Sequence, residues 1–406
     1  MANDEVVIVS AVRTPFDKFG GLLKDVPSIE LGALVIKEIL NRVGMPGRMI
    51  EEVYYGTCIP AETAQETNVP ARQAVLKAGL PSQTLSLTVD RACCSSLTAV
   101  GMGFYSIQAG RAQCCLAVGS ENMSRVPFIL SPKVRWGNRV GRIIVEDILF
   151  ELGYKEFNPV AVDAGEVALE MGVTREDQDR WAVRSQQRYG KAFQEGKFKV
   201  GEELMSLAIN SPKGERIIFD QDAQPRPDTT WEKLAALKTV YGSPTVTPGN
   251  APGLNTGASA ILLMKRSRAE AIGLKPLATV LTVAAVAGPP REIAKIPAPA
   301  IDKALSLVGM TLDGMDLIEI NEAFAAMPLV ASKILVNGNE KKLEALREKI
   351  NVNGGAIAIG HPVGASGARI LMTLMYELHR RGGGLGIAAI CGGLAQGESC
   401  VIKVDR

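Results

Sequence analysis

The chain has 406 residues, of which 47% are hydrophobic and 22% are charged, and its formal net charge is +2. This composition indicates a large core and two or more domains, and the nearly neutral charge argues against a nucleic-acid or membrane-surface binder. No apolar stretch approaches the roughly 20 residues that span a bilayer. The amino-terminal residues lack the basic region of a signal peptide, and the carboxyl-terminal residues do not match a peroxisomal targeting tripeptide. We therefore expect a cytoplasmic protein.

Strand-like and helix-like runs alternate over the first 120 residues. Alternation of this kind is typical of parallel βαβ units in an α/β fold. The run at 85–90 (LSLTVD) reads as a short buried strand. The patterns predict strands at 6–12, 51–59, 85–90 and 112–123, and helices at 28–44, 66–80 and 93–110.

Residues from about 121 to 250 differ in composition, with more charged residues, more proline and irregularly spaced apolar residues. One clear helix is predicted at 174–196, opened by Thr174 as N-cap with acidic residues in its first turn. We expect this region to be an insertion that covers one face of the fold and holds a substrate.

The carboxyl-terminal part repeats the pattern of strands and helices predicted for the first 120 residues. Aligning Gly110 with Gly382 brings residues 117–119 onto 389–391, so two copies of one unit are expected. The patterns predict a strand at 276–288, a helix at 299–310, a strand leading into a helix at 316–324, a helix at 364–382 and a closing strand pair at 384–404.

The stretch 89–100 (VDRACCSSLTAV) carries two adjacent cysteines, Cys93 and Cys94, before a predicted helix. They could form a reactive thiol with a bystander, two packing residues, or part of a metal or redox site. A thiol at the amino end of a helix lies near unpaired N–H groups, which favours the thiolate. Free cysteines are also among the most buried residue types, so packing stays an alternative.

Three further segments could carry chemistry. His361 lies in a glycine- and alanine-rich loop at the mouth of a helix, where backbone can approach a ligand closely, whereas His379 reads as a surface residue. Cys391 ends a predicted strand against a glycine turn, as a packing residue or a reactive one. Asn321 and Glu322 follow a strand, where α/β sheets bind ligands, but they could equally cap a helix.

These segments together resemble the thiolase family. The start VVIVSAVRTPF, the tract at 245–264, NEAFA at 321–325, GHPVGASGARI at 360–370 and CGGLAQG at 391–397 stand in the family's order and cover essentially the whole chain. The resemblance implies the five-layered αβαβα thiolase fold, with two duplicated βαβαβαββ halves and an inserted loop domain. The expected division is an N-terminal half at 1–120 completed by about 251–270, a loop domain for CoA and acyl binding at 121–250, and a C-terminal half at 271–406.

The resemblance also implies roles for individual residues. Cys93 would be the nucleophile that carries the acyl group, His361 its base, and Cys391 a second acid/base. Asn321 would hold a water that binds the thioester oxygen together with His361. The N–H groups of Cys93 and Gly393 would form a second oxyanion hole.

No permanently bound cofactor and no metal are expected, with coenzyme A as a substrate. With only two histidines and no CxxC, a zinc site is not expected from the sequence either.

Several positions depart from the thiolase pattern. Asp90 stands where an asparagine is common, Cys94 where a smaller residue is usual, and Pro159 and Val160 where a His-Met pair lies near the thioester. Pro252 replaces a serine whose hydroxyl usually faces the pantetheine. Arg226 matches the basic residue near the adenine and phosphate end of CoA. We therefore expect a thiolase for a branched, carboxylated or aromatic 3-oxoacyl-CoA.

Alternatives remain. The chain could act on acetoacetyl-CoA as an acetyl-CoA C-acetyltransferase, or be a non-catalytic acyl-CoA-binding relative. A decarboxylating ketosynthase would need a second histidine where Asn321 stands. The family further implies a homodimer or a dimer of dimers, and some branches work beside a small zinc-binding OB-fold protein.

Overall fold

The computed structural model describes residues 5–66, 68–150, 154–210 and 214–405. The strands are β1 (Val6–Arg13), β2 (Asp17–Lys18), β3 (Glu52–Gly56), β4 (Leu85–Val89), β5 (Cys114–Asn122), β6 (Phe128–Leu130), β7 (Val145–Asp147), β8 (Leu207–Asn210), β9 (Arg216–Phe219), β10 (Asn255–Lys265), β11 (Ala278–Ala287), β12 (Leu317–Ile320), β13 (Gly384–Gly392) and β14 (Gln396–Val404). The helices are α1 (Ser28–Val43), α2 (Pro60–Thr63), α3 (Pro70–Lys77), α4 (Ser95–Gln108), α5 (Val160–Glu170), α6 (Arg175–Gln194), α7 (Trp231–Ala235), α8 (Arg266–Ala271), α9 (Pro297–Leu307), α10 (Ala326–Leu335), α11 (Glu340–Lys349), α12 (Ala356–Ile359) and α13 (Ser366–Arg380).

The main sheet has the strand order β12-β13-β14-β11-β1-β10-β5-β3-β4. β3 runs parallel to β4 and β5, and β12 runs parallel to β13, as the βαβ pattern predicts. A short antiparallel pairing of residues 6–8 in β1 with residues 278–280 in β11 joins the two halves. This pairing makes one continuous sheet of the strands of both halves.

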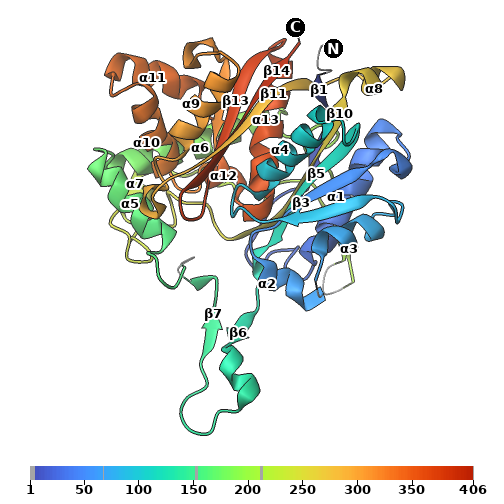
Figure 1. Ribbon diagram of the computed structural model, residues 1–406. Helices are drawn as coiled ribbons and strands as arrows, with labels where there is room; N and C mark the ends of the chain where they lie inside the picture. The colour runs from blue at the N-terminus through green and yellow to red at the C-terminus, as the bar shows by residue number, and fades with distance from the viewer. Residues whose placement is uncertain (1–4, 67, 151–153, 211–213, 406) are drawn as a thin grey trace.

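The three largest buried cores among the described residues lie between layers of helices and strands, five layers in all (Figure 1). Helices α1 and α3 cover the outer face of the first half-sheet, and α9 and α10 cover the outer face of the second. The middle core lies between the half-sheets, where Leu97 and Phe104 of α4 meet Leu371 and Met375 of α13. The predicted αβαβα layering is confirmed.

The two central helices occupy equivalent places in the duplicated unit. β5 follows α4 and pairs antiparallel with β10, just as β13 follows α13 and pairs antiparallel with β14. Gly110 and Gly382 end these helices with φ values of 72° and 82°, a left-handed conformation that glycine adopts without cost. The alignment of these two glycines in the sequence thus reflects the duplication.

One predicted strand is more exposed than expected. The strand predicted as buried at 85–90 is β4, and it lies at the edge of the sheet, with β3 as its neighbour in the strand order. Leu85 and Leu87 are 63% and 48% exposed. The apolar composition of this strand was therefore a poor guide to its burial within one chain, because burial depends on which neighbours the fold supplies.

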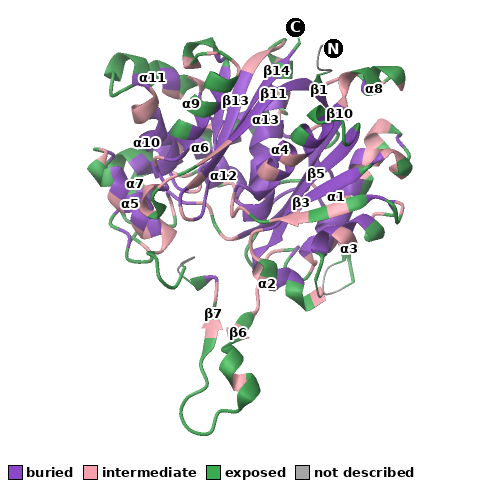
Figure 2. Cartoon of the chain, viewed as in Figure 1, coloured by how far each residue is buried: buried purple, intermediate pink, exposed green. Residues whose placement is uncertain are grey.

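The segment between β5 and β10 forms α5, α6, α7 and a projecting arm that contains β6 and β7 (Figure 1). Figure 2 shows the arm as largely exposed, and Trp136, between β6 and β7, is 83% exposed. α6 begins as predicted, since Thr174 and Asp177 form a reciprocal capping box. β10 then inserts between β1 and β5; the exact division of the chain into domains stays a prediction.

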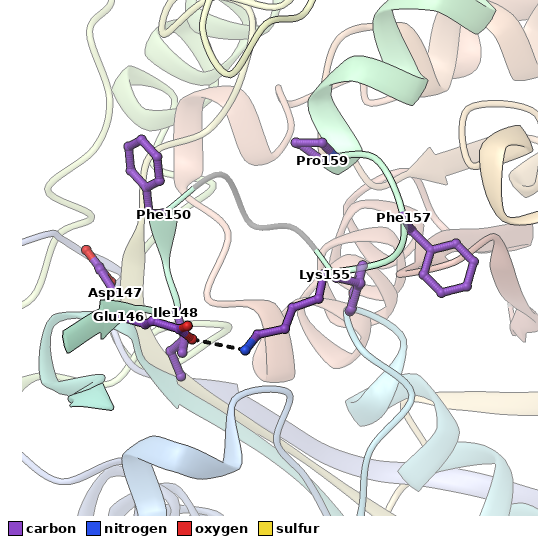
Figure 3. A pocket seen from close by; sticks show the side chains of 8 residues that line it. Glu146, Asp147, Ile148, Phe150, Lys155, Phe157 and Pro159 are labelled. Atoms are coloured by element: carbon purple, nitrogen blue, oxygen red, sulfur yellow. Dashed lines mark ion pairs between the residues drawn. The ribbon is translucent and has the colours of Figure 1, made fainter. Parts of the chain in front are cut away.

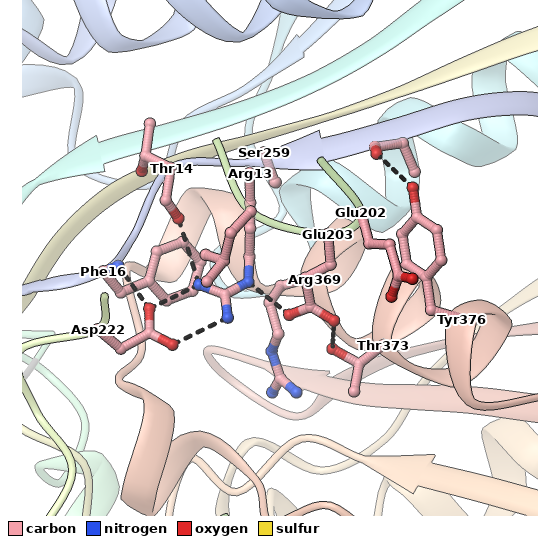
Figure 4. Close-up of polar contacts among 12 residues, drawn as sticks. Arg13, Thr14, Phe16, Glu202, Glu203, Asp222, Ser259, Arg369, Thr373 and Tyr376 are labelled. Atoms are coloured by element: carbon pink, nitrogen blue, oxygen red, sulfur yellow. Dashed lines mark hydrogen bonds and ion pairs between the residues drawn. The ribbon is translucent and has the colours of Figure 1, made fainter. Parts of the chain in front are cut away.

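Buried polar contacts attach the inserted segment to both halves. The Glu322 carboxylate accepts hydrogen bonds from Trp181 Nε1 (2.9 Å) and Ser185 Oγ (2.7 Å) of α6. Arg13 of β1 pairs with Glu203 (2.6 Å) and Asp222 (2.6 Å), both from the insert, and all three side chains are buried (Figure 4).

Within the described ranges, no helix combines the length and the apolar character needed to cross a bilayer.

Candidate active site

Cys93 lies in a tight turn directly before α4. The turn is held by Asp90 Oδ1, which accepts from the Ala92 N–H (2.8 Å), and by Ser95 Oγ, which accepts from the Arg91 N–H (2.9 Å). Ala92 has a φ of 47°, which is rare for a residue with a Cβ. Strained backbone of this kind often marks functional sites, and here it presents Cys93 at the start of the helix.

The expectation that the helix start favours the Cys93 thiolate is wrong for the folded chain. Burial raises the pKa of this thiol to about 12, and its own backbone N–H opposes the shift only in part. Negative charge on Glu121 and Asp90 raises the pKa further. The thiol is therefore protonated at neutral pH and needs a base to become a nucleophile.

The neighbouring sulfur has a different environment. Cys94 is fully buried in the core between the half-sheets, and its Sγ lies 3.5 Å from the Ile390 carbonyl oxygen. Cys93 keeps an exposed surface, whereas Cys94 has none. Of the two, only Cys93 can meet a substrate.

His361 is fixed from both sides. Its backbone N–H donates to Asn255 Oδ1 (2.8 Å), and its Nδ1 lies 2.6 Å from Ser366 Oγ. The Ser366 hydroxyl donates its one hydrogen to the Pro362 carbonyl (2.8 Å), so it accepts from Nδ1 and Nδ1 carries the proton. Nε2 is then the free, basic nitrogen.

The His361 ring is neutral over the whole physiological range. Burial, and then the positive charge of Arg369, lower its pKa to about 3. A neutral imidazole whose Nε2 lone pair is free can accept a proton from a thiol.

The His361 loop packs against the start of α4 through close backbone contacts. Ser96 Oγ accepts from the Ala368 N–H (2.9 Å). A Cβ atom on Gly119 would overlap the Gly364 carbonyl oxygen, so this approach requires glycine. Glu121 adds a further link by accepting from the Gly364 N–H (3.0 Å), and burial raises its pKa to about 8.

Asn321 follows β12 and faces the same histidine. Its backbone N–H donates to the Ala389 carbonyl (2.9 Å), and its Nδ2 lies 3.5 Å from His361 Nε2. The helix-cap alternative for Asn321 and Glu322 is wrong, since the following helix begins only at Ala326. Glu322 is occupied by its contacts with α6 and is a structural residue.

Cys391 stands near the end of β13 and is fully buried. Burial, and then negative charge on Cys93, raise its pKa above the usual range for a thiol, which indicates that the two sulfurs are neighbours. Gly393 follows in the turn to β14. A Cβ atom there would overlap the Tyr154 hydroxyl, so Tyr154 from the insert lies directly over Gly393.

Arg226 is exposed on the insert, where its backbone N–H donates to Gln186 Oε1 (2.7 Å). Its predicted role at the phosphates of CoA stays a prediction.

The sequence interpretation missed Ser366, Asn255, Glu121 and Tyr154. Ser366 and Asn255 lie inside segments that carry the family resemblance, at 360–370 and 245–264, so a search of those segments for a partner to each His361 nitrogen could have found them. Tyr154 has no such signal, because it comes from a distant part of the chain. Among the described residues, no cluster of three or more His, Cys, Asp or Glu side chains could hold a metal ion.

Comparison with known proteins identifies the family to which the chain belongs. Residues 6–267 match the thiolase N-terminal domain family, and residues 274–404 match the thiolase C-terminal domain family. An acetyl-CoA acetyltransferase of Syntrophomonas wolfei is 40% identical over 98% of this chain and 99% of its own length. One of Escherichia coli K12 is 41% identical over 98% of both chains.

Solved structures agree with these relatives. Human mitochondrial 3-ketoacyl-CoA thiolase superposes with a TM-score of 0.90 at 33% identity, covering 100% of both chains. Bacillus anthracis acetyl-CoA acetyltransferase also gives 0.90, at 37% identity over 99% of both chains. The chain therefore belongs to the thiolase family and is an acyltransferase of that family.

Proposed function

We propose that the chain cleaves a 3-oxoacyl-CoA with coenzyme A, or runs the reverse Claisen condensation, through an acyl-enzyme on Cys93. The observation that carries this proposal is that the protonated Cys93 thiol neighbours a second thiol, Cys391, while the loop that holds the neutral His361 ring packs against the start of α4. His361 Nε2 has the free lone pair, and Cys391 lies close enough to Cys93 for their charges to interact.

Each proton has a defined route in this scheme. His361 Nε2 takes the Cys93 proton, and the thiolate attacks the C3 carbonyl of the substrate. The C2–C3 bond breaks, which leaves the acyl group on Cys93 and an enolate of acetyl-CoA whose carbon takes the Cys391 proton. Coenzyme A then gives its thiol proton to Cys391 and attacks the acyl-enzyme. The Cys93 thiolate leaves and takes its proton back from His361 Nε2, so the products are acetyl-CoA and a shortened acyl-CoA.

The developing negative charges need donors. Asn321 Nδ2, 3.5 Å from His361 Nε2, can hold the water that meets the thioester oxygen of the leaving enolate. The N–H groups of Cys93 and Gly393 would take the oxygen of the acyl group. These assignments are proposals that follow the family pattern residue by residue.

A pocket beside this site supports a bulky acyl group. It has a volume of about 420 Å³, within the range of small-molecule sites. It is lined by Phe150, Tyr154, Phe157, Pro159 and Ile148, together with Glu146, Asp147 and Lys155 (Figure 3). Tyr154 joins the pocket to the cysteines, because its hydroxyl also lies over Gly393.

The charged side chains that line this pocket indicate which acyl groups it could accept. Lys155 is already paired with Glu146 (3.1 Å), as Figure 3 shows, which leaves Asp147 as an unbalanced negative charge. A carboxylated acyl chain would be repelled, whereas an uncharged branched or aromatic one would meet aromatic walls. We therefore favour an uncharged branched or aromatic 3-oxoacyl-CoA.

A substrate panel in the thiolysis direction tests this class. It compares kcat/KM for acetoacetyl-CoA with straight, branched, phenyl-bearing and carboxylated 3-oxoacyl-CoAs. We expect the branched or phenyl-bearing substrates to lead. A Tyr154→Ala variant should change the ratio of bulky to acetoacetyl substrate by about 10-fold, because one side-chain contact is worth about 1–3 kcal/mol. Tyr105→Ala, at an exposed position on α4, is the matched control and should leave the ratio unchanged.

The relatives' names favour a second candidate, an acetyl-CoA acetyltransferase acting on acetoacetyl-CoA. A clear preference for acetoacetyl-CoA in the panel would select this candidate and reject the bulky-substrate proposal. Binding of acyl-CoA without turnover of any substrate would instead favour the non-catalytic relative.

The assembly is also a proposal. The exposed apolar edge strand β4 supports a homodimer, and the exposed apolar side chains of the arm support a dimer of dimers. Light scattering of the wild type and a Trp136→Ser variant would test the arm. A small zinc-binding OB-fold partner and a cytoplasmic location stay predictions, and co-purification at native expression levels tests the partner.

A further inference from the structure

Arg369 is a fully buried arginine in the first turns of α13. Its Nη2 donates to Asn321 Oδ1 (3.3 Å). Its Nη1 lies 3.5 Å from Glu319 Oε2. Among the described residues, its Nε and Nη1 have no hydrogen-bond partner.

A second buried arginine shows what a structural one looks like in this protein. Arg13 Nε donates to Glu203 Oε1 (2.6 Å), and its two Nη atoms donate to Asp222 (2.6 and 2.9 Å). Figure 4 shows the two guanidinium groups near each other, with Glu203 beside both. Arg13 is fully paired, whereas Arg369 directs its one direct hydrogen bond at Asn321. A buried polar group that is left partly unpaired calls for an explanation, and a role at a functional site is one.

The contact with Arg369 decides which way the Asn321 amide points. An arginine can only donate hydrogen bonds, so the atom facing it must be the amide oxygen. The NH₂ group of Asn321 therefore faces His361 Nε2 (3.5 Å), which is the free acceptor of the ring. If the amide turned over, its oxygen would face the site and could not support a negative charge there.

We propose that Arg369 is a positioning residue that locks the Asn321 amide with its NH₂ group toward the oxygen of the leaving enolate. This inference rests on the proposed function. Through Asn321, Arg369 acts on the step that breaks or forms the C–C bond, because Asn321 serves that step. Acyl transfer between Cys93 and CoA relies on the N–H groups of Cys93 and Gly393 and does not use Asn321, although Arg369 also lowers the pKa of His361, which serves both steps.

Two reactions of the same protein separate a positioning role from a structural one. Thiolysis of a 3-oxoacyl-CoA requires the C–C step, whereas exchange of isotope-labelled CoA into acetyl-CoA requires only acyl transfer. For Arg369→Met we expect thiolysis kcat to fall by about 10- to 100-fold, below the roughly 10²- to 10³-fold loss for an absent oxyanion donor. The exchange rate should stay within about 3-fold of the wild type. Arg369→Lys, which keeps a donor, should recover part of the thiolysis rate.

A double-mutant cycle with Asn321→Ala gives the sharpest result. If Arg369 acts through Asn321, then Arg369→Met should cost less than about 2-fold in thiolysis once Asn321 is alanine. Should Arg369→Met not fold, the ratio of thiolysis to exchange in Arg369→Lys decides in its place, and a fall in that ratio supports the proposal. Equal losses in both reactions, or additive losses in the cycle, would overturn it and leave the proposed function standing. A wild type that performs neither reaction would overturn the proposed function itself.

Discussion

The hydroxyl of Ser366 offers a quantitative test of how His361 is held. Ser366 is fully buried and accepts from His361 Nδ1 (2.6 Å) while it donates to the Pro362 carbonyl (2.8 Å). Ser366→Ala leaves both groups without their partner, at a cost of about 1–3 kcal/mol for an unpaired buried group. The ring can recover this energy by rotating or by moving its proton to Nε2, and either change removes the base.

At 1.36 kcal/mol per factor of ten, this cost predicts that kcat/KM for thiolysis falls by about 5- to 150-fold. The loss should appear mainly in kcat, and the assay follows disappearance of the 3-oxoacyl-CoA. Ser332→Ala is the matched control. Ser332 lies in α10 and is equally buried, and its hydroxyl donates to the Leu329 carbonyl (3.0 Å) and accepts from Arg347 Nε (3.2 Å). Both variants should lose similar stability, but only Ser366→Ala should lose activity. A kcat/KM within 2-fold of wild type for Ser366→Ala would refute the assigned tautomer and its role.

Two further predictions concern stability. Because the pKa of His361 falls from 6.5 to about 3 on folding, the unfolded chain binds a proton below pH 6.5 that the folded one refuses, so stability is lost as the pH falls. Relative to His361→Asn, the wild type should lose about 2 kcal/mol of unfolding free energy between about pH 7.5 and pH 5 in denaturant titrations; an equal pH dependence of the two proteins would contradict this. Arg13→Met should destabilise the protein by about 3–5 kcal/mol, because it leaves two buried carboxylates unpaired. Arg180→Met, which removes an exposed ion pair, should cost less than about 1 kcal/mol, and similar midpoints for the two variants would show that the buried pair contributes little.

Much of the fold followed from the sequence, because apolar periodicity and turn residues act locally. The alternation of strands and helices, the Thr174 cap and the duplication around Gly110 and Gly382 are all present in the structure. The burial of β4 could not be predicted in the same way. Its residues suit a buried strand, but its position at the edge of the sheet is a property of the whole topology.

The chemical state of the site was also beyond local reasoning. The position of Cys93 before a helix suggested an acidic thiol, yet burial outweighs the helix and raises the pKa to about 12. Burial of this kind comes from several segments that meet only in the folded chain. The proposed role of Arg369 also depends on a contact that forms only in the folded chain. Arg369 lies in the GHPVGASGARI segment, but its role comes from a hydrogen bond to Asn321, 48 positions away.

In the proposed reaction Cys93, and not its neighbour Cys94, carries the acyl group. The most direct test of this assignment is peptide mapping by mass spectrometry after incubation with a 3-oxoacyl-CoA in the absence of free CoA. We predict an acyl adduct on Cys93 in the wild type and in Cys94→Ser, and none in Cys93→Ser. An adduct on Cys94 or Cys391, or one that survives in Cys93→Ser, would show that Cys93 is not the acyl carrier.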